Sequence, residues 1–286
     1  MPNHRQYNFD SEQKEGNNRQ KQIEVKTWVH TFSHPDEHKE FMEEFKIASQ
    51  FEMRYRGLLE FYGADLIAYK RNNMASQHVN EFLHILSKFF TDHLENNCPS
   101  SWKECQSTFW EEFISTCYPQ YMKLSTKHNE SEIFLTQLMK FVKWLDKRIG
   151  TTCYKAVKEY AENIASELRS CEQLLNELHL HSFPRLHAGD WNPMEDISRI
   201  ENELQDCDDT INSIFEVESI AGNLVTLCDI DSTKTYQVTD FPAENVRPGI
   251  LLEGTIGRKN YAFYWLWYHI EGVYPQIAQK YISFEN

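Results

Sequence analysis

Three histidines and one aspartate lie close together in the segment LHLHSFPRLHAGD, residues 178–190. Imidazole nitrogens and carboxylate oxygens are zinc ligands, and a bound zinc can activate water for hydrolysis. One hypothesis is therefore a metal-dependent hydrolase with a His-rich loop. The alternative is a helix end whose histidines lie near its negative dipole. The ligands in the hydrolase hypothesis are His179, His181, His187 and Asp190.

A second group of chemically active residues is acidic. Between Asp190 and Glu218 the chain holds ten acidic residues and one basic residue, Arg199, which together supply −9 of the formal net charge of −14. Spaced carboxylates on one helix could bind a basic protein, even as a mimic of nucleic-acid phosphates. The alternative is a solvated surface that keeps the protein soluble. The carboxylates of this candidate surface are Glu201, Glu203, Asp206 and Asp208.

The third group is aromatic, because residues 261–268 read YAFYWLWY. Alternate side chains of a strand point to opposite faces, and here both faces would be apolar. A strand that is apolar on both faces is normally covered on both, so we interpret this stretch as a buried contact between two domains. Exposed rings beside cations would instead favour binding of single-stranded nucleic acid by base stacking. The residues of that alternative are Arg258, Lys259, Tyr261 and Trp265.

Residues 227–233 read LCDIDST and resemble the DxDxT element of haloacid-dehalogenase-like phosphatases. The resemblance implies an aspartate nucleophile at Asp229 and an acid/base aspartate at Asp231. That family needs a parallel sheet with crossover helices, whereas the surrounding sequence predicts short antiparallel strands. We therefore interpret Asp231 and Ser232 as part of a hairpin turn.

Composition limits the other possibilities. The chain has 286 residues, 41% of them hydrophobic, which suits one large domain or two ordinary ones. Seven widely spaced cysteines without a CxxC pair, and a polar start without a secretory signal, indicate a cytoplasmic protein with reduced thiols. No apolar run is long enough for a membrane helix, so we expect no membrane contact. No Walker A loop, G-x-S-x-G, H-E-x-x-H or G-x-G-x-x-G motif occurs, and we expect no cofactor.

Helices must position the first two groups. Apolar residues at helical spacing predict helices that start near Pro35, Val79, Trp102 and Glu130, the last ending at Gly150. Two heptad-spaced seams follow, and Asn192-Pro193 predicts the start of the second. Consecutive seams with a short connection predict an antiparallel helical hairpin, which packs within the chain or pairs with a second copy. The seams are Tyr154, Val157, Ala161, Ile164, Leu168, Cys171, Leu175 and Leu178, then Ile197, Ile200, Leu204, Cys207, Ile211 and Ile214.

Strands must position the aromatic group, because the apolar period changes after the second seam. Five short strands with tight turns follow one another in the last part of the chain, and Pro275 opens a short terminal helix. This pattern predicts a small antiparallel β-barrel of SH3-like or OB-like type.

The sequence therefore predicts an α+β fold. Residues 1–27 form a flexible polar tail, residues 28–213 an α-helical domain with the hairpin at 152–213, and residues 214–286 the barrel with its short helix. The preferred function is non-catalytic: a cytosolic interaction or regulatory protein that binds a protein partner, possibly a basic one, through the acidic helix and the aromatic β-domain. Nucleic-acid binding and metal-dependent hydrolysis are the alternatives.

Overall fold

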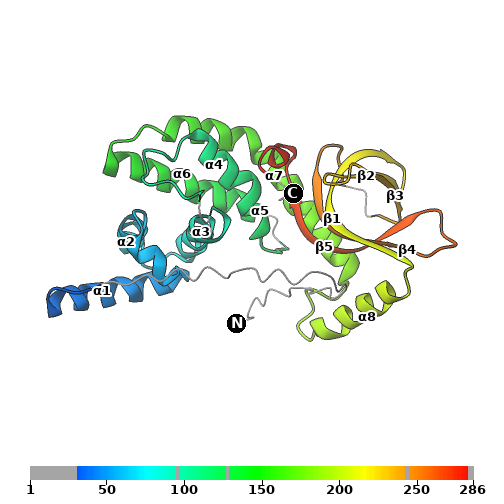
Figure 1. Cartoon of the computed structure of the whole chain (residues 1–286), viewed down its shortest axis with the longest axis horizontal. Coiled ribbons are helices and arrows are strands. Elements are labelled where there is room, and N and C mark those ends of the chain that lie inside the picture. Colours follow the sequence, from blue (N-terminus) through cyan, green and yellow to red (C-terminus); the bar gives the residue numbers. More distant parts are fainter. Residues whose placement is uncertain (1–30, 95–96, 127–128, 242–244, 283–286) are drawn as a thin grey trace, which may run out of the picture. The chain divides into compact units, whose positions relative to one another are not determined.

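The computed structural model describes residues 31–94, 97–126, 129–241 and 245–282, so the predicted tail at 1–27 lies outside the described residues. Helices fill the first part of the described chain and five strands the second, with α7 in contact with both (Figure 1). The helical elements are α1 (Pro35–Ala48), α2 (Gly63–Arg71), α3 (Gln77–Lys88), α4 (Ser107–Glu112), α5 (Tyr118–Gln120), α6 (Glu130–Ile149), α7 (Tyr154–Ser182) and α8 (Pro193–Gln205).

The ends of α6 show why these residues form a helix. Its C-terminal residue is followed by Gly150 at φ 75°, a left-handed conformation that glycine adopts without strain. At its N-terminus the buried carboxylate of Glu172, on α7, accepts hydrogen bonds from the N–H groups of Glu130 (3.0 Å) and Ser131 (3.1 Å). These N–H groups have no partner within α6, so α7 both caps α6 and packs beside it.

The predicted third helix begins later than its apolar spacing indicates. Trp102 lies in a turn region, α4 starts at Ser107, and the chain continues through a π-helical turn at Phe113–Cys117 into α5. Pro119 lies directly after the π-helical turn, within α5. The apolar spacing correctly predicted which side chains of this segment are buried, but it placed the start of the helix too early. Trp102 is held by packing against other rings and not by a helix of its own.

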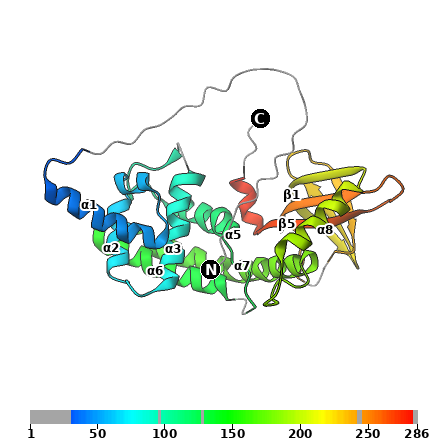
Figure 2. The same cartoon turned by 90° about the horizontal axis from the view of Figure 1, so that it is seen from below.

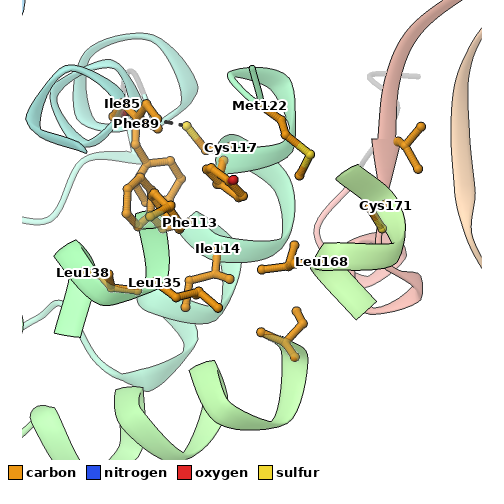
Figure 3. Close-up of a cluster of buried hydrophobic side chains, with 14 of the residues drawn as sticks. Ile85, Phe89, Phe113, Ile114, Cys117, Met122, Leu135, Leu138, Leu168 and Cys171 are labelled. Atoms are coloured by element: carbon orange, nitrogen blue, oxygen red, sulfur yellow. Dashed lines mark hydrogen bonds between the residues drawn. The ribbon is translucent and has the colours of Figure 1, made fainter. Parts of the chain in front are cut away.

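The core of the helical part is mainly aromatic. Phe141 is buried at its centre, with ring centroids 5.4 Å from Phe82 and 5.8 Å from Trp102. Figure 3 shows a neighbouring region, where Phe89 and Phe113 from two π-helical turns face each other above Leu135 and Leu138 of α6. All seven cysteines are free thiols.

The seam of α7 is used within the chain, as the intrachain alternative predicts. Val157, Ala161, Ile164, Leu168, Cys171, Leu175 and Leu178 are buried, and α7 packs against α4, α6 and β5. The seam therefore offers no free apolar face for a second copy.

The second seam does not form the predicted hairpin with α7. Helix α8 ends at Gln205 and β1 begins at Asp209, so Ile211 and Ile214 lie in a strand and pair with Ile256 and Glu253 of β4. A spacing of three fits a helix face locally, but the β-branched Ile211 and Ile214 also favour a strand, and here pairing with β4 decides between the two. Helix α8 itself packs on β5 instead of lying along α7 (Figure 2).

The strands are β1 (Asp209–Ala221), β2 (Leu224–Asp229), β3 (Thr235–Thr239), β4 (Leu251–Arg258) and β5 (Trp265–Tyr274). They form one closed ring in the order β1-β2-β3-β5-β4. Neighbours are antiparallel except β3 and β5, which close the ring with a short parallel pairing of Val238 with Trp265 and Thr239 with Leu266. The interior holds Phe215, Val217, Val225, Leu227, Val238, Leu252, Ile256, Trp267 and Ile270.

Asp231 and Ser232 lie in the turn between β2 and β3, as interpreted from the sequence, while residues 227–229 of LCDIDST belong to β2. The carboxylate of Asp229 accepts hydrogen bonds from the hydroxyls of Ser232 (2.6 Å) and Ser213 (2.8 Å) and from the N–H of Asp231 (3.1 Å). Burial opposes ionisation of Asp229, but these bonds outweigh it and hold its pKa below the usual value. A carboxylate engaged in this way closes the β2–β3 turn and is not a free nucleophile.

After β5 the chain forms the 3₁₀-helix η6 (Gln276–Lys280), which confirms the predicted helix after Pro275. Within the described ranges, none of the helices has both the length and the apolar character needed to cross a membrane.

Candidate interaction surface on α8 and the β4–β5 loop

Helix α8 starts at a capped, acidic N-terminus. The side chain of Asn192 accepts a hydrogen bond from the N–H of Met194 (3.2 Å), and Pro193 occupies the first helical position, as predicted. Glu195 and Asp196 lie in the first turn, where the helix dipole favours negative charge. Most of α8 is solvent-exposed, and Ile200 is its one buried residue.

One apolar cluster holds α8 on β5. Ile200 packs with Phe183, which follows α7, and with Tyr268 of β5. The thiol of Cys207 donates to the Tyr268 hydroxyl at 3.3 Å, and Arg199 donates to the Ser182 carbonyl at 2.5 Å. Because the apolar side of α8 is used here, its opposite side and its C-terminal end carry the exposed carboxylates.

The C-terminal end of α8 is also joined to the loop between β4 and β5, residues 259–264. The N–H of Asn260 donates to the Asp208 carboxylate at 2.7 Å, and the N–H of Asp208 donates to the Arg258 carbonyl at 3.0 Å. Burial raises the pKa of Tyr268, and so do, in decreasing order, the Cys207 thiol and the carboxylates Glu203 and Asp206. The acidic end of α8 and this loop therefore form a continuous surface.

The aromatic stretch differs from its prediction as a strand covered on both faces. Strand β5 starts only at Trp265, and the residues before it form the loop. Tyr261 is 81% exposed and Phe263 91% exposed, whereas Trp265 and Trp267 are buried in the ring of strands. The β4–β5 hairpin extends past the end of its sheet neighbours, so nothing in the described residues covers these rings (Figure 1). Tyr264 and Leu266 are exposed as well.

The two cations of the nucleic-acid alternative are engaged with carboxylates. Arg258 donates to Asp209 at 2.7 Å, and Lys259 lies 3.9 Å from Asp206. Arg258 also places its guanidinium carbon 5.0 Å from the Trp265 ring centroid. A phosphate would therefore compete with existing partners and meet the negative field of α8.

The predicted acidic residues lie together on or next to α8. Glu201 is exposed and makes no hydrogen bond or ion pair within the described part of the chain, while Glu203 pairs with Arg199 at 3.2 Å. Asp206 and Asp208 follow the last turn and face the β4–β5 loop through Lys259 and Asn260. We define the interaction surface as Glu201, Asp206, Asp208, Tyr261, Phe263, Tyr264 and Leu266.

The histidine group is spread over different environments. His179 stacks on Phe183 (6.0 Å), and burial together with the nearby His269 lowers the pKa of His179 to about 4. His181 and His187 are exposed, and Asp190 pairs with Arg185 at 2.7 Å. Among the residues that the structure describes, no three or more His, Cys, Asp or Glu side chains are placed to hold a metal ion.

Sequence reasoning missed the exposure of Phe263, Tyr264 and Leu266. A usable signal was present, because the polar residues Arg258, Lys259 and Asn260 separate two apolar runs as a turn does, and a turn that extends to Tyr264 leaves these side chains outside the ladder. The eight-residue run YAFYWLWY instead favoured a continuous strand. His269, the neighbour of His179, was also missed, since it is ninety residues away in the sequence.

Comparison with known proteins gives no relative. No family model matches the chain, and neither a curated protein nor a solved structure matches it.

Proposed function

We propose that this chain is a non-catalytic interaction or regulatory protein that binds a basic protein partner through the interaction surface. The observation that carries the proposal is the exposure of Tyr261 and Phe263 in the loop that Asn260 joins, by a hydrogen bond, to the Asp208 carboxylate after α8. Large apolar side chains grouped on an otherwise polar surface are typical of binding sites, and aromatic residues are enriched in them. Negative charge around such a patch favours a positively charged partner and speeds its encounter.

The rest of the predicted organisation belongs to the same proposal. In this proposal the helical residues up to Asp208 support the interaction surface. The closed sheet, which we assign to the SH3-like or OB-like barrels, presents the β4–β5 loop to the partner. A protein of this kind would act in the cytoplasm. Nucleic-acid binding is disfavoured because Arg258 and Lys259 pair with Asp209 and Asp206. Hydrolysis is disfavoured because the histidine group is dispersed.

A site-specific cross-linker tests the proposal. The full-length chain would carry a photoactivatable residue at Phe263, and, as a matched control, at Met74, which is 52% exposed in the helical part. Irradiation in cell extract should give a protein adduct at the first position that is absent at the second. The adduct should disappear when Tyr261 and Leu266 are both replaced by serine. Identical adducts at both positions, or an adduct that survives the serine replacements, would contradict the proposal.

A further inference from the structure

The structure contains its own example of how this surface can hold a cation. Arg258 lies over the Trp265 ring, 5.0 Å from guanidinium carbon to ring centroid, and at the same time donates to the Asp209 carboxylate at 2.7 Å. A flat guanidinium can satisfy both partners, because its face contacts the ring while its edge donates N–H groups to the carboxylate. Arg258 and Trp265, which make this contact, lie at the two ends of the β4–β5 loop that carries the exposed rings.

Aromatic rings and carboxylates also occur in the neighbouring residues, where no cation of the described chain lies over a ring. Tyr261, Phe263 and Tyr264 make no ring–ring or cation–ring contact with any described residue, and Glu201 has no ion-pair partner there either. Asp206 pairs with Lys259 at 3.9 Å, so an arginine of a partner would exchange with that lysine at Asp206. The hydrogen bond from Asn260 to Asp208 keeps the ring-bearing loop next to the acidic end of α8. The surface thus offers exposed rings in a loop that is bonded to Asp208 and Asp206, with Glu201 in the adjoining last turns of α8.

Charge decides among the possible occupants. A second copy of this chain would bring another acidic α8, and a nucleic acid or an anionic lipid surface would bring phosphates, so all three are repelled. A basic protein segment is attracted. Between the two basic side chains, arginine fits better than lysine, because its guanidinium is planar, weakly hydrated and able to stack on a ring while bonded to a carboxylate.

We propose that the interaction surface recognises arginine side chains in an extended basic segment of the partner. The inference rests on the proposed function and specifies its ligand: arginines stack on Tyr261 and Phe263 and pair with Asp206 and Glu201. It reproduces between two proteins the arrangement that Arg258, Trp265 and Asp209 make within this one.

Fluorescence anisotropy with defined peptides tests the inference on the full-length chain. The probe is a labelled peptide of repeated Gly-Ser-Arg units, compared with the same peptide carrying lysine or citrulline in place of arginine. Citrulline keeps the planar shape but has no charge. The arginine peptide should bind about tenfold more tightly than the lysine peptide, and the citrulline peptide should lose most of the binding. Equal affinity for arginine and lysine peptides would overturn the inference.

Single substitutions in the interaction surface and in the helical part test where the arginine peptide binds. Phe263→Ala and Glu201→Gln should each weaken binding of the arginine peptide by about three- to tenfold. Tyr55→Ala and Glu132→Gln replace an exposed tyrosine and an exposed glutamate of the helical part, and should leave the affinity unchanged. All four positions are exposed, so thermal unfolding should be unaffected. An equal loss in the surface and control variants would show non-specific charge attraction and overturn the inference.

The two proposals fail in different ways. If the cross-linker at Phe263 captures a partner while no arginine peptide binds, the interaction function stands and the arginine inference is wrong. If neither the cross-linker nor the peptide finds the surface, both are wrong.

Discussion

The protein contains two groups of aromatic side chains with opposite environments. In the helical part the rings of Tyr69, Phe82, Trp102 and Trp110 surround Phe141 at centroid distances from 5.0 to 6.4 Å, and all of these residues are buried. In the β4–β5 loop, Tyr261 and Phe263 are exposed and make no ring contact with the described residues. The same residue type therefore stabilises the fold in one region and contributes almost nothing to it in the other.

The buried rings and the exposed rings differ in how much they contribute to the stability of the fold. Burying an aromatic side chain contributes several kcal/mol through the area it removes from water and its ring contacts, on the order of 2–4 kcal/mol per side chain. An exposed ring gains none of that and raises the risk of aggregation. The proposed binding of a partner would account for exposed rings on the loop, and for that reason we assign the proposed function to the loop and α8 rather than to the core.

The largest expected effect on stability comes from removing an aromatic ring from the helical core, compared with removing one from the β4–β5 loop. Phe141→Ala should lower the free energy of unfolding by about 3–5 kcal/mol, because it leaves a cavity in a densely packed core. Phe263→Ala should change it by less than about 0.5 kcal/mol. Urea unfolding of both variants measures the contrast. A large loss for Phe263→Ala would show that the loop is part of the core and remove the basis of the comparison.

The next effect concerns the buried cap of α6. Glu172→Ala should cost about 3 kcal/mol, because the N–H groups of Glu130 and Ser131 and the Ser131 hydroxyl lose their acceptor inside the protein. Glu172→Gln keeps one acceptor oxygen and should lose less. Chemical denaturation measures both. If the two variants lose the same stability, the negative charge of Glu172 and not its hydrogen bonds supports α6.

A pH effect is expected at the contact between α7 and β5. Burial lowers the pKa of His179 to about 4 and also lowers the pKa of His269, whereas Glu271 acts in the opposite direction on His269. Both histidines bind protons more readily in the unfolded chain, so stability should be complete above pH 6.5 and fall as the pH drops towards 4. For His179 the loss amounts to up to about 3 kcal/mol.

The measurement is urea unfolding of the wild type and of His179→Gln between pH 7.5 and 5, above the range in which ordinary carboxylates titrate. The wild type should lose more stability over this interval than the variant. Parallel curves would show that His179 binds protons equally well in the folded and unfolded protein, and would contradict a lowered pKa for this histidine.

The smallest effect concerns the exposed cap of α8. Asn192→Ala should cost about 1 kcal/mol, because the N–H of Met194 loses its acceptor but remains accessible to water. Asn192→Asp keeps the acceptor and should be neutral or slightly stabilising near the helix N-terminus. Hydrogen exchange of the α8 amides reports the change locally. Faster exchange throughout the helical core would mean that α8 is coupled to that core, against the contrast drawn between the two regions.

Much of the fold could be predicted from local patterns. The limits of α6 follow from its apolar spacing and Gly150, and the seam of α7 follows from its heptads, because both depend on neighbours within a few turns. The acidic residues of the candidate site were also found, since a charge run on an amphipathic helix is visible in the sequence. The exposed rings were not, because YAFYWLWY is equally compatible with a covered strand and with a loop that leads into a strand.

The sequence by itself determined the order of helices and strands, the helix ends at Asn192 and Gly150, and the excess of negative charge after Asp190, because these depend on side-chain chemistry and short-range hydrogen bonds. The tertiary structure alone decided that α8 stops before β1, that α8 lies on β5, and that Tyr261 and Phe263 are exposed in a loop bonded to Asp208. Each of these outcomes depends on contacts between residues far apart in the chain, such as Ile200 with Tyr268 and Ile211 with Ile256. Their free energies are absent from any local pattern.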